Sequence, residues 1–172
     1  MNFSIAETMR RLLAPRHKLS CSQHVWNRLV TCLRKRGINQ SRESGAFLLG
    51  HRRNGRARIV DFVLYDDLDP RCLDSGIVRF DGRFYGELWD LCKRRGLSVV
   101  ADVHVHPDGP RQSESDRANP MISSGGHIAL ILPHFAASPV RRREIGIYLY
   151  EGGKQWSTVR PGERQTFFHI GL

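Results

Sequence analysis

Helix-like and strand-like patterns alternate along residues 22–105, and this alternation limits the folds that the chain can adopt. One helix is predicted from Ser22, whose side chain can cap it, to Gly37, and another from Asp81 to Gly96. Short segments rich in apolar and β-branched residues lie around these helices and are predicted strands: residues 45–49, 58–65, 77–80 and 97–105. Because strands and helices interleave, the expected fold class is α/β.

Strands dominate the remainder of the chain. Four more are predicted at residues 128–132, 145–150, 156–159 and 167–170, and turn signals stand at Asn54-Gly55 and Gly152-Gly153. The complete pattern is expected to form a mixed central β-sheet flanked by helices. We divide the chain into an N-terminal extension, residues 1–20, which includes a short predicted helix at residues 6–13, and one domain, residues 21–172.

The length of 172 residues suits one domain and is too short for a (β/α)₈ barrel of roughly 250 residues. No apolar run approaches the roughly 18 residues that a membrane-spanning helix needs, and the N-terminal residues lack the pattern of a signal peptide. These features predict a cytoplasmic protein that does not bind a membrane. The four cysteines show no C-x-x-C spacing, so we expect free thiols in the core: Cys21, Cys32, Cys72 and Cys92.

The formal net charge is +10, from 27 Lys and Arg residues against 17 Asp and Glu residues, and only four of the 27 are Lys. Such an excess of positive charge attracts nucleic acid, anionic membranes or an acidic protein. No helix-turn-helix, zinc-finger or aromatic RNA-binding motif accompanies it. The charge alone therefore favours a solvated surface over nucleic acid, and it identifies no partner by itself.

Residues 101–120, ADVHVHPDGPRQSESDRANP, carry the most chemical information. His104 and His106 are two residues apart at the end of a predicted strand, so both imidazoles should point to one face of the sheet. A catalytic zinc site needs three protein ligands and leaves a fourth position for water. The two imidazoles could supply two ligands, and Asp108 and Asp116 are the candidates for the third.

The positions of several other polar and aromatic side chains can also be predicted. Asp102 lies one strand period before His104, so it either shares the face of the ligands or is a carboxylate at the edge of the sheet. His127 is expected to form a hydrogen bond near the site. Trp26, Trp89 and Trp156 have apolar neighbours, so we expect them to fill the core.

Four sequence elements resemble the JAMM motif of the MPN+/JAB zinc peptidases. They are Glu43 in ESGAFLLG, His104-Val105-His106-Pro107, Pro107-Asp108-Gly109-Pro110 as in the prokaryotic branch, and Ser113-Glu114-Ser115-Asp116. They stand in the order of that motif, and the resemblance extends from about residue 22 to residue 150. Val105 replaces a common Ser or Thr, and the loop from His106 to Ser113 is one residue shorter than usual, which could displace Ser113 or bring in Ser115.

The resemblance implies an MPN/JAB architecture, similar to that of cytidine deaminases, with one Zn²⁺ per chain. His104, His106 and Asp116 would be the metal ligands, together with a water molecule. Glu43 would act as general base and then as general acid, and Ser113 would donate a hydrogen bond to the oxyanion. These roles describe a zinc-dependent, deubiquitinase-like isopeptidase.

The family's substrates imply that the chain cleaves the C-terminal tail of a ubiquitin-like protein, from a precursor or from a conjugate. E1-like and E2-like proteins would then be partners, in a bacterial conjugation system, including antiviral ones, or in sulfur-carrier processing. Two alternatives are a nucleic-acid-associated module with a JAB-like fold and a different zinc hydrolase. His104-x-His106-x-Asp108 is similar to a metallo-β-lactamase pattern, but Gly109 stands where that pattern has a His.

Overall fold

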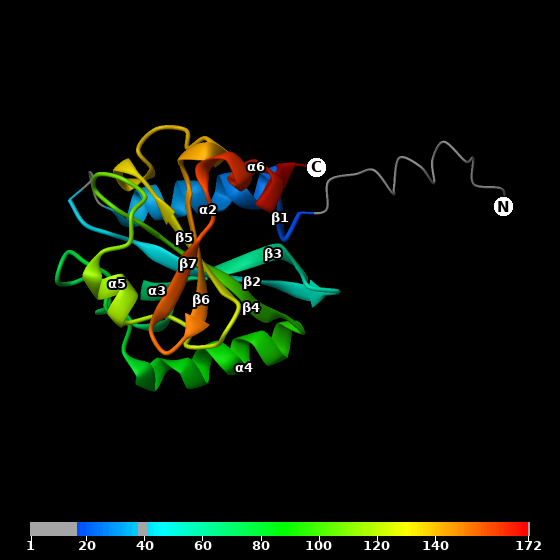
Figure 1. Cartoon of the computed structure of the whole chain (residues 1–172). Coiled ribbons are helices and arrows are strands. Elements are labelled where there is room, and N and C mark those ends of the chain that lie inside the picture. The colour runs from blue at the N-terminus through cyan, green and yellow to red at the C-terminus, as the bar shows by residue number, and fades with distance from the viewer. Residues whose placement is uncertain (1–16, 38–40, 172) are drawn as a thin grey trace, which may run out of the picture.

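The computed structural model describes residues 17–37 and 41–171, so the helix predicted at residues 6–13 lies outside the described residues. One mixed, curled sheet of eight strands organises the fold, in the order β7-β6-β5-β4-β2-β3-β1-β8 (Figure 1). The strands are β1 Leu19–Ser22, β2 Gly45–Arg53, β3 Arg56–Leu64, β4 Ser98–Val105, β5 His127–Leu132, β6 Gly146–Gly152, β7 Gln155–Thr158 and β8 Phe168–Gly171. The α/β class and the mixed sheet with flanking helices are therefore confirmed.

Helices lie on both faces of this sheet. The α-helices are α2 Gln23–Arg36, α3 Tyr65–Leu68, α4 Tyr85–Arg95, α5 Glu114–Ala118 and α6 Arg164–Phe167. The short 3₁₀ helices are η1 Gly82–Phe84, η2 His134–Ala136, η3 Arg142–Glu144 and η4 Pro161–Glu163. In the part of the chain that the structure describes, no helix is both long enough and apolar enough to cross a bilayer.

Helix α2 covers one face of the sheet, as its apolar spacing predicts. The Ser22 hydroxyl caps it by accepting a hydrogen bond from the amide of Val25 at 3.3 Å. Its apolar side chains, including Trp26 and Leu29, are buried in the larger core cluster together with Phe168 of β8. Three basic residues in its last turn lie at the negative end of the helix dipole, which stabilises this terminus.

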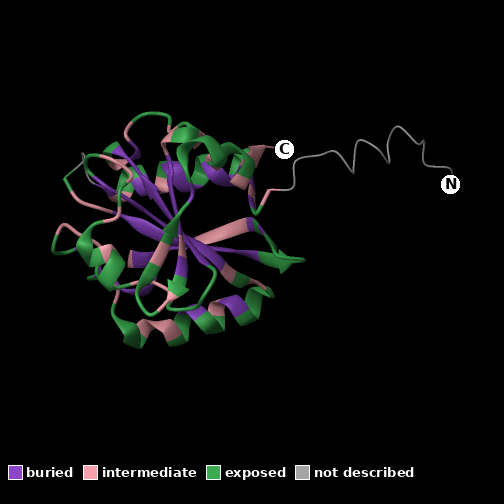
Figure 2. Cartoon of the chain, viewed as in Figure 1, coloured by how far each residue is buried: buried purple, intermediate pink, exposed green. Residues whose placement is uncertain are grey.

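Helix α4 covers the opposite face (Figure 1). The carboxylate of Asp81 caps the preceding η1 turn, and α4 ends at Gly96, whose φ of 62° is in the left-handed region. Leu88 and Cys92 on α4 pack against Phe47 of β2 in a second core cluster. Both faces of the central strands are therefore buried, as Figure 2 shows by the purple strands between the helix layers.

The pairing of the central strands determines which residues meet at the end of the sheet. β2 pairs antiparallel with both β3 and β4, and β4 pairs parallel with β5. In the β2–β4 register, Gly45 at the start of β2 lies opposite His104 near the end of β4. Glu43, two residues before Gly45, is thereby brought to the same end of the sheet as the two histidines.

Three details differ from the sequence predictions. Strand β1 was not predicted; it pairs with β3 and β8, two partners far away in the sequence, and it spans the expected boundary at residue 21. The strand predicted at residues 77–80 is wrong: this segment is irregular, because its amides bond to a carboxylate and a loop carbonyl rather than to a strand. Trp89 was expected in the core, but 47% of it is exposed.

The four cysteines are free thiols, as expected. Cys32 is half-buried and the other three are buried. Burial raises the pKa of the Cys21 and Cys72 thiols to about 12. A thiol reacts as its thiolate, so both are inert core residues rather than catalytic nucleophiles.

Candidate metal centre

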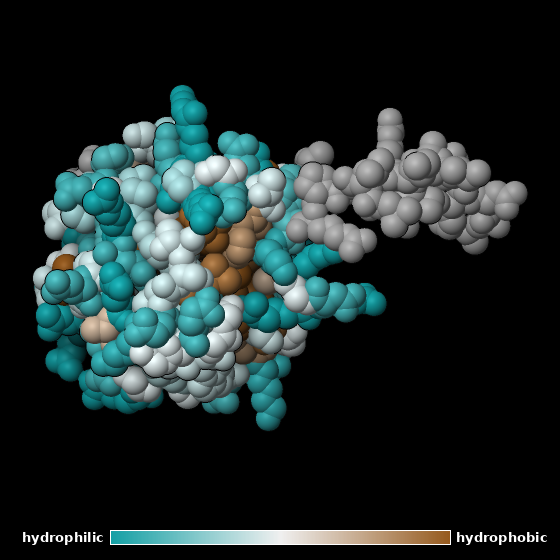
Figure 3. Space-filling view, in the orientation of Figure 1, coloured by the Kyte–Doolittle hydropathy of each residue, from teal (hydrophilic) through white to brown (hydrophobic). Residues whose placement is uncertain are grey.

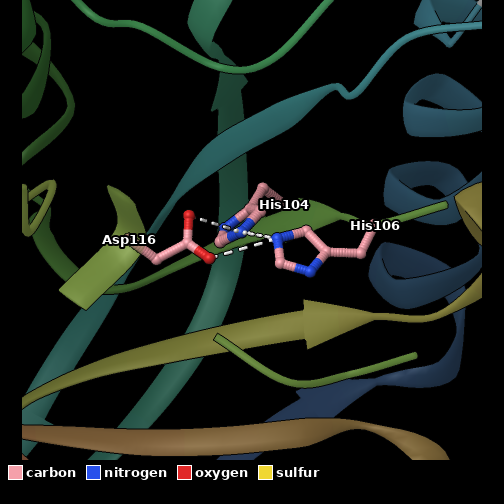
Figure 4. Close-up of side chains that lie close together, drawn as sticks. All are labelled: His104, His106 and Asp116. Atoms are coloured by element: carbon pink, nitrogen blue, oxygen red, sulfur yellow. Dashed lines mark hydrogen bonds and ion pairs between the residues drawn. The ribbon is translucent and has the colours of Figure 1, made fainter. Parts of the chain in front are cut away.

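The two predicted histidine ligands lie together at the end of β4. His104 and His106 are two residues apart on an extended strand, so their side chains leave the same face, and both are buried. Their Nε2 atoms are 2.9 Å apart (Figure 4). A neutral imidazole has one ring nitrogen without a hydrogen, and the lone pair of that nitrogen can bind a cation, so the two converging Nε2 atoms can act as a pair of metal ligands.

Asp116 completes the group from helix α5. Its Oδ1 lies 3.4 Å from His104 Nε2, and its Oδ2 lies 3.2 Å from His106 Nε2 (Figure 4). Asp108, the other carboxylate that the sequence left open, is exposed and is not part of this group. The structure therefore selects Asp116 as the third candidate ligand.

Although the loop between His106 and Ser113 is short, it still places Asp116 beside the two histidines. Helix α5 begins with a capping box: the Ser113 hydroxyl accepts from the Asp116 amide at 3.1 Å, and Asp116 Oδ2 accepts from the Ser113 amide at 2.7 Å. The Tyr148 hydroxyl donates to the Pro110 carbonyl at 2.6 Å, which anchors the loop to β6. The loop is one residue shorter than is usual for the JAMM motif, and this difference does not prevent His104, His106 and Asp116 from lying together.

The geometry of the three donors fits a single small metal ion. All three ligand atoms lie within 4.8 Å of one another. A tetrahedral ion with bonds of about 2.0–2.1 Å holds its ligands about 3.3 Å apart. The two Nε2 atoms are 2.9 Å apart, and each lies 3.2–3.4 Å from one of the two carboxylate oxygens of Asp116, which is close to that spacing. Two imidazoles and one carboxylate are also a common donor set for such an ion.

The electrostatics of the group favour a cation. Burial opposes protonation of His104, but the hydrogen bond and charge of Asp116, with the charges of Asp102 and Glu43, prevail and raise its pKa. Burial alone would raise the pKa of Asp116, yet the bonds from both imidazoles hold it well below its usual range. Asp116 is therefore ionised at neutral pH beside two donor nitrogens.

Glu43, the predicted general base, lies at the edge of this group. Its Oε1 is 3.7 Å from His106 Nε2, while its Oε2 accepts a hydrogen bond from the Val78 amide at 3.1 Å. Its own amide donates to the Gly76 carbonyl at 2.9 Å. The irregular segment around residue 78 thus orients the carboxylate and leaves Oε1 directed toward the histidines.

Ser113 occupies a different place from the ligands. It is exposed, and its hydroxyl serves as the cap of α5, where the oxygen accepts and the hydrogen remains free to donate. Through the capping box it orients Asp116. A hydrogen bond from Ser113 to a reacting carbonyl stays a prediction.

A pocket of about 450 Å³ opens beside Asp116. Its wall is made by the irregular segment before α4, by α4 itself and by the segment of α5 and beyond: Val78, Arg79, Phe80, Tyr85, Ser115, Asp116, Asn119, Pro120 and Met121. The Tyr85 hydroxyl donates to the Met121 carbonyl and closes one side of the pocket. Apart from Ser115 and Asp116, sequence reasoning assigned none of these residues to the site, because they come from separate segments and share no motif.

A buried polar network lies below the histidines on the same face of β4. Asp102 Oδ1 is 2.5 Å from His127 Nε2, and the Tyr65 hydroxyl donates to Asp102 Oδ2 at 3.1 Å. Asp102 thus lies beneath the histidines and not at an edge of the sheet, because β4 is paired on both sides, and His127 forms the expected hydrogen bond. The network joins β4, β5 and the residue after β3 under the candidate metal centre.

Fold and site together define an α/β protein whose curled mixed sheet carries a candidate metal centre of two histidines and one aspartate. No protein-family model matches the chain. It is 25% identical over 156 residues to the "Probable metalloprotease y4jG" of Sinorhizobium fredii, and the alignment covers 91% of each protein.

Two solution structures share the fold. Protein DSY2949 of Desulfitobacterium hafniense matches with a TM-score of 0.64 and 15% identity, over 88% of this chain and 92% of that one. A protein of Salinibacter ruber matches with a TM-score of 0.53 and 17% identity, over 83% of this chain and 91% of that one. At such identities these likenesses establish the fold alone.

Proposed function

We propose that the chain is a zinc-dependent peptidase whose ion is held by His104, His106 and Asp116. The observation that carries this proposal is the convergence of two Nε2 atoms and one carboxylate, with a second carboxylate, Glu43, 3.7 Å from His106. The name of the S. fredii relative, a probable metalloprotease, supports the same reaction class. The order of these residues in the sequence agrees with the JAMM motif.

In this proposal, each side chain has a task that its position allows. A zinc ion held by His104, His106 and Asp116 would lower the pKa of a bound water molecule and polarise the scissile carbonyl. Glu43 takes the proton of the attacking water at Oε1 and delivers it to the leaving amine, while the Val78 amide holds Oε2 in place. Ser113 donates its hydroxyl hydrogen to the developing oxyanion and keeps Asp116 oriented through the capping box.

The proposed substrate is the C-terminal tail of a ubiquitin-like protein, in a precursor or in an isopeptide conjugate. The pocket beside Asp116 supports an extended substrate, because Ser115 and Asn119 line it and offer polar groups that a peptide backbone could bond to. A Gly-Gly tail would pass close to the ligands without a side chain to collide with them. E1-like and E2-like proteins would supply such conjugates in the cytoplasm, in a conjugation or sulfur-carrier system.

A cleavage assay tests the proposal. The zinc-loaded protein is incubated with a ubiquitin-like protein carrying a C-terminal extension, with and without a chelator, beside its Glu43→Gln variant. The expected result is cleavage directly after the C-terminal tail of the ubiquitin-like protein. This cleavage should be absent in the presence of the chelator and in the Glu43→Gln variant. Absence of cleavage by the intact protein across a panel of such fusions, or cleavage that persists in Glu43→Gln, would refute the proposed peptidase function.

A further inference from the structure

The β2–β3 hairpin ends in a basic ribbon that the proposed peptidase chemistry does not use. Its residues are His51-Arg52-Arg53-Asn54-Gly55-Arg56-Ala57-Arg58, which we call the basic hairpin. The turn uses positive φ at Asn54 (51°) and Gly55 (69°), the combination that closes a tight two-residue hairpin. The tip projects from the body of the molecule (Figure 1), and hydrophilic side chains cover it in Figure 3.

The basic hairpin lies far from the candidate metal centre. Gly45, at the start of β2, is opposite His104, whereas Arg53 ends the same strand. Eight residue steps of about 3.3 Å separate the two ends by roughly 26 Å. A ligand on the hairpin is therefore outside the reach of the metal ligands.

The pairing of the strands puts four cationic or titratable side chains on one face of the hairpin. His51 pairs with Arg58, and Arg53 pairs with Arg56, so each pair points to the same side. Ala57, between two of these arginines, is buried on the opposite, core-facing side. All four side chains of the two pairs belong to exposed residues.

This face borders a shallow groove of about 490 Å³. The four paired residues line it. The other lining residues come from the turn, from β3, from β1 and from the residue two positions before β1, and the full set is His17, Ser20, His51, Arg53, Asn54, Arg56, Ala57 and Arg58. None of the described residues that line it carries a carboxylate. Within residues 17–37 and 41–171, no ion pair involves Arg53, Arg56 or Arg58, although other arginines there do form ion pairs.

The chemistry of the groove distinguishes between two classes of anionic partner, an acidic protein and a nucleic acid. Stable protein–protein interfaces need an apolar or aromatic centre, and the basic hairpin exposes neither: Ala57 is its one apolar side chain and is buried. Interfaces with nucleic acid are more polar and much more positively charged. Guanidinium groups bind phosphate oxygens with two parallel hydrogen bonds.

We propose that the basic hairpin binds the phosphate backbone of duplex DNA. A two-stranded antiparallel ribbon fits the major groove, which is about 12 Å wide, and its arginines then reach phosphates on the groove edges. The contacts are to phosphates, so the binding is independent of base sequence. This activity is separate from the proposed peptidase reaction and does not need a metal ion.

Fluorescence anisotropy with a labelled 20-base-pair duplex tests the inference on the full chain over a salt series. Three phosphate contacts, from Arg53, Arg56 and Arg58, predict a slope of log K against log salt of about −2.7. The double variant Arg53→Gln/Arg56→Gln should reduce the magnitude of that slope by about 1.8 and weaken binding about 60-fold in 0.1 M salt. Unchanged melting temperatures verify that the exposed substitutions leave the fold intact.

The matched control removes the same charge elsewhere. Arg141 and Arg143 are exposed residues near η3, and Arg141→Gln/Arg143→Gln should retain most of the binding. Added chelator should also leave binding unchanged. No binding by the intact chain, or an equal loss in both double variants, overturns the inference. Tighter binding to a labelled decaglutamate peptide than to the duplex also overturns it and assigns the hairpin to an acidic protein.

Discussion

Removal of the Asp102 carboxylate should destabilise the protein strongly, because this group is the centre of the buried network below the histidines. Asp102 is 2% exposed, His127 is 3% exposed and Tyr65 is fully buried. Asp102→Ala leaves the His127 Nε2 and the Tyr65 hydroxyl without the oxygen atoms that they contact. Each buried polar group left without its partner costs about 1–3 kcal/mol, so the two together should lower the free energy of unfolding by about 3–5 kcal/mol.

Urea titration of the metal-free protein measures this cost. The chelator is present throughout, because a bound ion would add stability that depends on its concentration. For a domain of this size, a loss of about 3–5 kcal/mol lowers the melting temperature by roughly 6–20 °C. Asp74→Ala is the matched control: Asp74 is exposed, so its substitution should change stability by less than about 0.5 kcal/mol.

A double-mutant cycle with His127→Ala isolates the contact itself. The Asp102→Ala/His127→Ala variant should be more stable than the sum of the single losses predicts, by about 1–3 kcal/mol, since the double variant leaves no imidazole without its partner. A loss below about 1 kcal/mol for Asp102→Ala, or strict additivity in the cycle, would refute the reasoning.

Three further predictions concern the site and the sheet. Glu43→Gln should lower the cleavage rate by roughly 10²–10⁴-fold while zinc content, measured by mass spectrometry, stays the same; loss of zinc would instead make Glu43 a ligand. The raised pKa of His104 means that its protonated pairing with Asp116 adds stability below about pH 6.5, and that this contribution is lost as pH rises through the folded-state pKa. Zinc must displace that proton, so titration calorimetry in two buffers should detect proton release and weaker affinity at lower pH; pH-independent affinity contradicts this. Gly50→Ala should cost more than about 1 kcal/mol, because a Cβ would collide with the backbone of β3, whereas Gly125→Ala, with open space around it, should be near neutral in the same urea assay.

Local patterns account for most of the elements that sequence reasoning identified. The helical spacing and cap of α2 depend on residues within one segment, and so does the apolar run of β4. Strand β1 has four residues, two of them serines, and exists because β3 and β8 pair with it. The irregular segment at residues 77–80 has strand-like alternation because Val78 and Phe80 pack on the second core cluster, but none of the described strands pairs with it.

In the candidate site, too, some features follow from the local sequence and others depend on contacts between distant segments. The common face of His104 and His106 follows from the period of a strand, which is local. Spacing alone could not separate Asp108 from Asp116; the capping box of α5, set by Ser113, turns Asp116 inward. The support of Glu43 by the Val78 amide depends on a contact across 35 residues and has no signal in the sequence.

The zinc content of the purified protein and its variants tests the central claim most directly. We expect one zinc per chain in the intact protein and in Asp108→Ala, and loss of the metal in His104→Ala and Asp116→Ala. A metal-free intact protein at saturating zinc, or a site that is lost with Asp108 and retained without Asp116, would contradict it.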